Sequence, residues 1–114
     1  MVMRRVDAVA LIDDPMHIAN IGTIADLALE KRLPSIGFLN LPNAGGLIAY
    51  SANFDEIHRR AAYFVDKVLK GVKPSDIPVE RATRFKLLIN LKTAKALGLT
   101  LPQSLLSRAD EVIQ

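Results

Sequence analysis

Apolar and polar residues alternate along this chain in blocks that predict strands and helices in turn. Residues 6–12 form a short run rich in β-branched residues and closed by Asp13-Asp14-Pro15, which is typical of a buried strand of a parallel sheet followed by a turn. Apolar residues then recur at helical spacing from Ile18 to Ala28. The pattern predicts one helix that begins at Pro15 and is stopped by Pro34.

The middle of the chain continues this alternation. Residues 36–39 and 47–50 are expected to form two further short strands, separated by a loop rich in Pro, Asn and Gly. A long helix is expected over residues 54–70, ending at Gly71 in a left-handed C-cap. One face of this helix is apolar, and the opposite face is charged and solvated. The apolar face carries Phe54, Ile57, Ala61, Phe64, Val65, Val68 and Leu69.

The last third of the chain predicts one more strand and two helices. After a proline-marked connection, residues 85–90 read as a strand whose last residue, Asn90, can cap a short helix over residues 93–97. Pro102 is expected to begin a final helix with the apolar stripe Leu105, Leu106, Ala109, Val112 and Ile113. About four strands and four helices in alternation indicate an α/β fold with a parallel sheet flanked by helices.

Composition excludes several classes of protein. The 114 residues make one domain or less, and the absence of cysteine excludes a disulfide framework, a thiol nucleophile and a cysteine-based metal site. The net charge of +3 comes from dispersed basic residues rather than the dense stripe of a nucleic-acid binder. No run approaches the roughly 20 apolar residues of a membrane helix. Asp7 interrupts the N-terminal apolar run, so we expect no export signal in this chain, which made alone would stay in the cytoplasm.

The sequence offers no constellation for catalysis. It contains neither the G-x-S-x-G pattern of a nucleophile elbow nor the H-E-x-x-H pattern of a zinc peptidase. The two histidines, His17 and His58, have no metal-ligand partners at helical spacing. We therefore expect a protein that is not an enzyme and that needs no metal or cofactor.

Five phrases, in order along the chain, carry a resemblance to a known family. They are AGGLIAY at 44–50, HRRAAY at 58–63, VLKGVKPSDIPVE at 68–80, FKLLINLKTA at 85–94 and ALGLTLP at 96–102. Together they resemble the C-terminal portion of the ABC-transporter substrate-binding proteins whose best-understood members bind aromatic amino acids. No single phrase is decisive, but the resemblance covers essentially the whole chain.

The resemblance implies a partial periplasmic binding protein type I fold, in which two Rossmann-like lobes close on a ligand between them. It implies that residues 1–47 and 85–114 belong to the second lobe and that residues 51–78 pack on a first lobe, most of which this chain lacks. The implied partners are a small-molecule ligand, such as an amino acid, and the membrane subunits of the transporter. Full-length members are expected in the periplasm or anchored on the outer side of the membrane.

The absent first lobe has a physical consequence. Without it the apolar face of the helix over residues 54–70 has no sheet to cover, and an exposed face of that kind usually finds a partner. We expect this chain to form a homodimer or to exchange an element between two copies.

Five residues are candidates for ligand contacts, each with a structural alternative. Asp14 follows a strand, where its carboxylate can pair with a ligand ammonium or merely cap a helix. His17 can donate to a ligand carboxylate or be an ordinary exposed histidine. Gly45 and Gly46 let backbone approach a ligand or let the chain bend between lobes. Tyr50 can stack on a ligand or lie half-buried in the core. Ser51 stands where the family usually has glycine, which alters the turn after Tyr50.

Two functions remain open at the level of sequence. The first is a solute-binding component of an ABC-type importer. The second is a truncated relic that binds no solute and acts as a dimerising scaffold.

Overall fold

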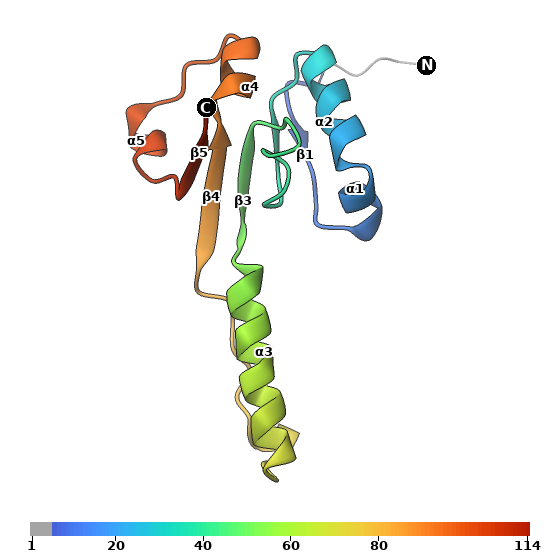
Figure 1. The fold of residues 1–114 in the computed structure, drawn as a ribbon, viewed down its shortest axis with the longest axis vertical. Coiled ribbons are helices and arrows are strands. Elements are labelled where there is room, and N and C mark those ends of the chain that lie inside the picture. Colours follow the sequence, from blue (N-terminus) through green and yellow to red (C-terminus); the bar gives the residue numbers. More distant parts are fainter. Residues whose placement is uncertain (1–5) are drawn as a thin grey trace. The chain divides into compact units, whose positions relative to one another are not determined.

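The computed structural model describes residues 6–114, and the chain divides into two compact units (Figure 1). Unit 1 takes the chain up to Ser51 together with Lys86–Gln114, and unit 2 is Ala52–Phe85. Strands β3 and β4 lead from one unit to the other and back.

A five-stranded sheet in the order β1-β2-β3-β4-β5 organises unit 1. Strands β1, β2 and β3 run parallel to one another, and β4 is parallel to β5. Strands β3 and β4 run in opposite directions, because Asn53 N donates to Arg84 O at one end while Asn90 N donates to Leu47 O at the other. The α/β class is confirmed, with a mixed rather than wholly parallel sheet. The strands are β1 (Val9–Ala10), β2 (Ser35–Gly37), β3 (Ile48–Ala52), β4 (Phe85–Asn90) and β5 (Glu111–Ile113).

The first strand is shorter and more exposed than predicted. The sequence predicted a buried strand over residues 6–12, whereas β1 spans Val9–Ala10 at the edge of the sheet and Ile12 is 73% exposed. The prediction of a buried strand was wrong, because β1 has a neighbouring strand on one side within the described sheet. Burial depends on those neighbours and not on the apolar run itself.

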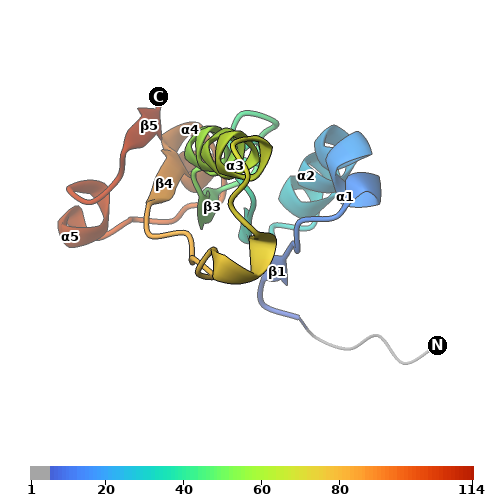
Figure 2. The ribbon, with the colours of Figure 1, turned by 90° about the horizontal axis from the view of Figure 1, so that it is seen from below.

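The predicted helix after Pro15 is two helices, α1 (Pro15–Ala19) and α2 (Ile21–Glu30), which lie side by side in both views (Figures 1 and 2). The break is at Asn20, whose φ of −112° is not helical. Its side-chain Nδ2 donates to the carbonyl oxygen of Met16 at 2.8 Å. Asparagine breaks helices in this way because its amide competes for nearby backbone groups. Ala25 and Ala28 of α2 are buried.

The core of unit 1 is built from apolar side chains of the strands and a tight loop before β3. Leu41, Ala49 and Ile89 are fully buried. Gly46 packs against Leu41 so closely that an added Cβ would lie 2.4 Å from its Cγ. Glycine at this position therefore permits the loop to close over Leu41.

The turn from β4 into α4 (Leu91–Ala96) is as the sequence predicted. Asn90 ends β4, and its Oδ1 accepts a hydrogen bond of 3.1 Å from the backbone amide of Thr93. This is N-cap geometry, and it satisfies one of the orphan donors of the helix. Gly98, with φ of 71°, follows the helix in the left-handed conformation.

The predicted final helix was wrong. Helix α5 covers Gln103–Leu106, and the chain then turns into strand β5, so that Val112 pairs with Ile89 of β4. Asp110, directly before β5, is held against β4 by two hydrogen bonds to Leu87. Its backbone amide donates to Leu87 O at 2.9 Å, and its Oδ2 accepts from Leu87 N at 2.8 Å. Pairing with a strand distant in sequence outweighs the local helical spacing of the apolar residues.

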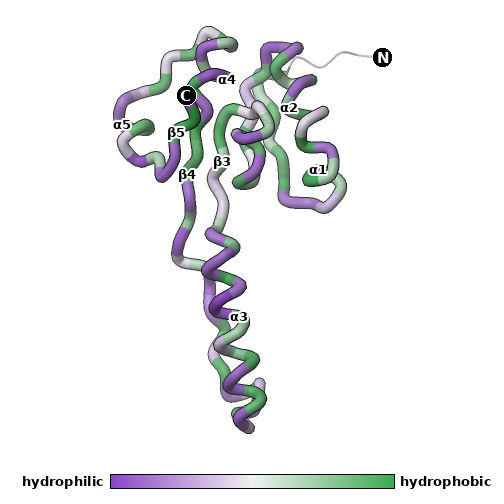
Figure 3. The backbone as a smooth tube through the Cα atoms, viewed as in Figure 1, coloured by the Kyte–Doolittle hydropathy of each residue, from purple (hydrophilic) through white to green (hydrophobic). Residues whose placement is uncertain are grey.

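Unit 2 consists of α3 (Phe54–Leu69), the 3₁₀ turn η1 (Pro74–Asp76) and an extended segment that returns along the helix. Gly71 has φ of 95°, which confirms the predicted left-handed residue after the helix. Hydrophobic and hydrophilic residues alternate along α3 (Figure 3). Within the described chain no residue of α3 is buried.

Candidate functional site

A hollow of about 200 Å³ opens at the carboxyl ends of the three parallel strands of unit 1. Strands β1, β2 and β3 end on the same edge because they run in the same direction, and ligands of open α/β sheets bind at such edges. The lining comes from all three strands and the residues that follow them. It consists of Ala10, Leu11, Asp13, Ile36, Gly37, Phe38, Tyr50 and Ser51.

Strand register brings two aromatic residues of this hollow together. Gly37 of β2 pairs with Ala49 of β3, which places Phe38 and Tyr50 at the next positions of the two strands. Phe38 is 5% exposed and is part of the core, whereas Tyr50 is 59% exposed and presents a large surface at the rim. An aromatic side chain in this situation offers apolar area together with a polar hydroxyl.

Besides the Tyr50 hydroxyl, the polar side-chain groups of the hollow are the carboxylate of Asp13 and the hydroxyl of Ser51. Asp13 lies in the loop directly after β1 and is exposed. A carboxylate, a hydroxyl and two aromatic side chains suit a small molecule with a positively charged end and an apolar body. The sequence did not predict Asp13, Phe38 or Ser51 as ligand contacts, and Asp13 was interpreted as solvated. For Asp13 and Ser51 the usable signal was their position directly after a predicted strand.

Asp14, a predicted ligand contact, caps a helix. Its Oδ1 accepts a hydrogen bond of 2.8 Å from the backbone amide of Met16, at the start of α1. This was the structural alternative of the sequence analysis. Asp14 is not among the described residues that line the hollow. Its contact with a ligand stays a prediction.

His17 is engaged within its own segment. Its Nδ1 lies 3.1 Å from the carbonyl oxygen of Ile12, a distance at which the ring N–H donates to the carbonyl. This hydrogen bond ties the end of the β1 loop to α1. A role for His17 toward a ligand carboxylate stays a prediction.

The two glycines lie before the start of β3 and do not line the hollow. Gly45, with φ of 104°, accepts a hydrogen bond of 2.8 Å at its carbonyl oxygen from Thr93 Oγ1. Gly46 is buried against Leu41. Packing and a left-handed turn account for both glycines, and their contact with a ligand stays a prediction. Of the five predicted ligand contacts, Tyr50 is the one that appears among the described residues lining the hollow.

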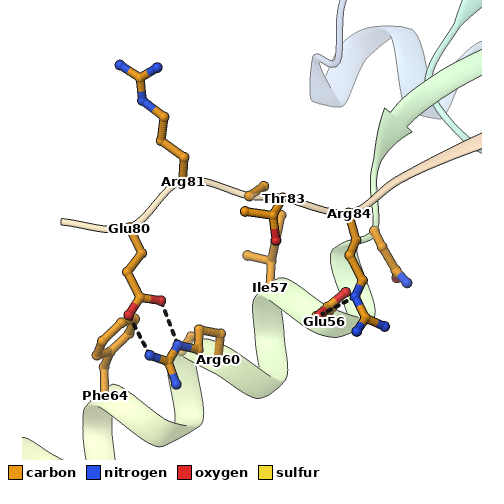
Figure 4. A pocket seen from close by; sticks show the side chains of 11 residues that line it. Glu56, Ile57, Arg60, Phe64, Glu80, Arg81, Thr83 and Arg84 are labelled. Carbon is orange, nitrogen blue, oxygen red and sulfur yellow. Dashed lines mark hydrogen bonds and ion pairs between the residues drawn. The ribbon is translucent and has the colours of Figure 1, made fainter. Parts of the chain in front are cut away.

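Unit 2 contains a second hollow, of about 320 Å³, between α3 and the returning segment (Figure 4). Arg60 donates from Nε at 2.7 Å and from Nη2 to the two oxygens of Glu80, and Arg84 Nε lies 3.3 Å from Glu56 Oε1. The floor between these ion pairs is formed by Ile57, Ala61 and Phe64. Both carboxylates of this hollow pair with arginines, and a third arginine, Arg81, also lines it.

No group of three or more His, Cys, Asp or Glu side chains could hold a metal ion among residues 6–114. Over the same residues, no helix combines the length and the apolar character that crossing a membrane requires.

A comparison with family models shows one family. The model of the family "ABC transporter substrate binding protein" matches residues 1–113. No curated protein sequence matches the chain.

Three solved structures share the fold. A conserved domain protein from Vibrio cholerae has a TM-score of 0.86 at 24% identity, over 93% of this chain and 36% of its own. An ABC domain in complex with L-Trp from Streptococcus pneumoniae has a TM-score of 0.84 at 29% identity, over 96% of this chain and 38% of its own. A substrate binding protein with adhesive properties from Clostridium difficile, ligand-free and open, has a TM-score of 0.65 at 21% identity, over 93% and 36%. The chain therefore spans little more than a third of these relatives.

Proposed function

Because this chain belongs to the ABC transporter substrate binding protein family, we propose that it is part of the solute-binding component of an ABC-type importer. The family is one of solute-binding proteins and not an enzyme class. The observation that carries the proposal is the hollow at the carboxyl ends of β1, β2 and β3, with Asp13 and Tyr50 at its rim.

The lining favours an amino acid or a related small amine as the solute. The Asp13 carboxylate would pair with the ammonium group, and Tyr50 would pack against an apolar side chain. The relative from Streptococcus pneumoniae, which is 29% identical, was solved with L-Trp, and this supports the same class of solute.

The proposed partners follow from the length of the chain. Because it spans 36–38% of the solved relatives, we propose that unit 1 belongs to the second lobe of a two-lobed protein. Residues 51–78 would pack on the first lobe wherever that lobe is present. Closure of the two lobes on the solute would then present the protein to the membrane subunits of the transporter, in the periplasm or anchored outside the membrane.

A thermal-shift screen of the twenty L-amino acids and of small amines tests the proposal. We expect at least one solute to raise the melting temperature of the 114-residue chain, because a ligand of the folded state stabilises it by mass action. Asp13→Asn should weaken that response, and Asp7→Asn, which changes the same charge away from the hollow, should not. The same screen on a protein that also carries the first lobe gives the decisive result. If that protein shifts with no solute, the proposed function is wrong.

A second candidate function is favoured by a separate observation. No residue of α3 is buried within the described chain, so the chain by itself exposes an apolar helix face. We propose that the chain forms a homodimer through this face. If it binds no solute, it serves as a dimerising scaffold.

A further inference from the structure

A third hollow, of about 480 Å³, lies within unit 1 and shares no lining residue with the candidate site. Helix α4, the segment that follows it, α5 and the residue after β5 form its walls (Figure 1). All of its lining residues fall between positions 91 and 114, so one continuous stretch of chain builds this α4 hollow. It is larger than the two hollows described above.

Backbone hydrogen bonds hold the walls of the α4 hollow in place. Gly98 ends the α4 turn in the left-handed conformation, and the amide of Leu99 then donates to the carbonyl oxygen of Ala94 at 2.9 Å. The segment after α4 is thereby folded back along the helix. Pairing of β5 with β4 brings the end of the chain beside α4, where Gln114 lines the hollow.

The interior of the α4 hollow is apolar. Leu91, Leu101 and Leu106 line it and are half-buried, and Leu99 is 39% exposed. Leucine side chains that remain accessible to water favour a ligand with an apolar body, because the ligand removes their surface from water.

The ionisable side chains among the described residues of this lining are Lys92 and Lys95, both of which are exposed. Within residues 6–114 neither lysine forms an ion pair. The two lysines are three positions apart on α4, which makes them neighbours on the helix surface. Their positive charges therefore repel each other, and a negative group between them would relieve that repulsion.

We propose that the α4 hollow binds a small carboxylate with an apolar tail. The carboxylate accepts hydrogen bonds from the ammonium groups of Lys92 and Lys95, and the tail lies against the leucine side chains. The volume of the hollow falls in the range of roughly 300–1,000 Å³ that is typical of small-molecule pockets. This site is separate from the hollow at the carboxyl ends of β1, β2 and β3, so the inference does not depend on the proposed solute.

Octanoate is a suitable probe, because it joins one carboxylate to a straight apolar tail. Methyl NMR on leucine-labelled protein follows the hollow directly through Leu99, Leu101 and Leu106. We expect these methyl signals to shift and to saturate at octanoate concentrations below those at which micelles form. Shifts that never saturate, or that spread evenly over the leucines of the protein, would overturn the inference.

The same titration is to be made on a protein that also carries the first lobe. We expect the same leucine signals to shift there, because the lining of the α4 hollow comes wholly from residues 91–114. Loss of these shifts when the first lobe is present would mean that the hollow is covered in the longer protein, and the inference would be wrong.

Two matched ligands separate the head from the tail. Octylamine has the same tail with a positive charge, and acetate has the carboxylate without the tail. We expect each to bind at least about tenfold more weakly than octanoate, because each lacks one of the two recognised groups. Octylamine that binds as tightly as octanoate would show that the lysines recognise nothing.

A lysine double variant tests the charged part of the site. Lys92→Gln combined with Lys95→Gln should raise the octanoate dissociation constant by about fivefold or more, since two exposed ion pairs are lost. Lys67→Gln combined with Lys70→Gln is the matched control. It removes two lysines at the same spacing from α3, outside the hollow, and should leave the dissociation constant unchanged.

A leucine variant tests the apolar part in the same way. Leu99→Gln should weaken octanoate severalfold, whereas Leu27→Gln, at an exposed position of α2 away from the hollow, should not. Circular dichroism checks that all variants stay folded. Octanoate binding that is insensitive to both the lysine double variant and Leu99→Gln would place the ligand elsewhere and overturn the inference.

The candidate solute site is judged separately. Asp13→Asn should leave the octanoate titration unchanged, because Asp13 does not line the α4 hollow. A thermal-shift screen without any amino-acid response would refute the proposed function and leave the octanoate result as it stands.

Discussion

The side chain of Asn90 donates from Nδ2 to the carbonyl oxygen of Pro42 at 2.8 Å, across 48 residues of sequence. The same side chain caps α4 through its Oδ1, and its backbone amide donates to Leu47. One buried asparagine therefore joins β4, the loop before β3 and the start of a helix.

Asn90→Ala should destabilise unit 1. The change leaves the carbonyl of Pro42 and the amide of Thr93 without their partner, and a buried polar group left unsatisfied costs about 1–3 kcal/mol. Urea unfolding followed by circular dichroism measures the loss. Asn43→Ala, at an exposed position of the same loop, should change the free energy of unfolding little. Equal effects of the two variants would contradict the role given to Asn90.

Gly46→Ala and Gly22→Ala should act in opposite directions. A Cβ at Gly46 would lie 2.4 Å from Leu41 Cγ and 3.0 Å from Leu41 O, so the loop or the core must shift, at about 1–3 kcal/mol. A Cβ at Gly22 meets no atom within 4 Å, and alanine is the better helix former by up to about 1 kcal/mol. Thermal unfolding of both variants measures the difference. A Gly46→Ala chain as stable as the wild type would show that Leu41 yields easily.

Two substitutions at Asp14 separate helix capping from solute binding. Asp14→Asn keeps a good N-cap and removes the charge, so we expect unchanged stability. An unchanged solute response in this variant would assign Asp14 to helix capping alone. Asp14→Ala removes the hydrogen bond to Met16 and should cost about 0.5–2 kcal/mol. The measurement is a melting curve with and without the best solute of the screen. Loss of the solute response in Asp14→Asn would instead assign Asp14 to the ligand site.

The ion pair between Arg60 and Glu80 predicts a pH dependence for unit 2. Hydrogen bonds from the Arg60 guanidinium, together with its charge, hold the pKa of the Glu80 carboxyl below its ordinary value. A lowered pKa in the folded state means that the stabilisation is complete above the ordinary glutamate pKa of about 4.3 and is lost as the pH falls through the lower, folded value.

Carboxyl-carbon NMR across an acid titration measures this pKa directly. Arg60→Gln should return the pKa of Glu80 to the ordinary range, whereas Arg59→Gln, which removes the same charge one position away, should leave it low. The ion pair is exposed to solvent, so salt should weaken the effect. An ordinary Glu80 pKa in the wild type would contradict the pairing.

Local chemistry along the chain predicted much of the fold. Asn90 as a cap, Gly71 in the left-handed conformation and the apolar face of α3 were all predicted, because each depends on residues within one or two turns of it. The break at Asn20 was missed, although asparagine's preference for nearby backbone groups was a usable signal.

Long-range pairing decided what the sequence could not. Val112 and Ile113 have helical spacing with Leu105, yet they form β5 because β4 offers hydrogen bonds to a strand at that edge. The direction of β4 relative to β3 has no signature in either strand, since both directions use the same apolar residues.

For the candidate site, too, local sequence predicted some features and long-range strand pairing decided the others. The sequence by itself determined the α/β class, the segments that carry the chemistry and the place of Tyr50 in a short strand. Only the tertiary structure decided that Tyr50 lines one hollow with Asp13 and Phe38, while Gly45 and Gly46 lie before the start of β3 and away from it. The physical reason is that an element's own residues fix its type, whereas the neighbours of a side chain depend on how distant strands pair.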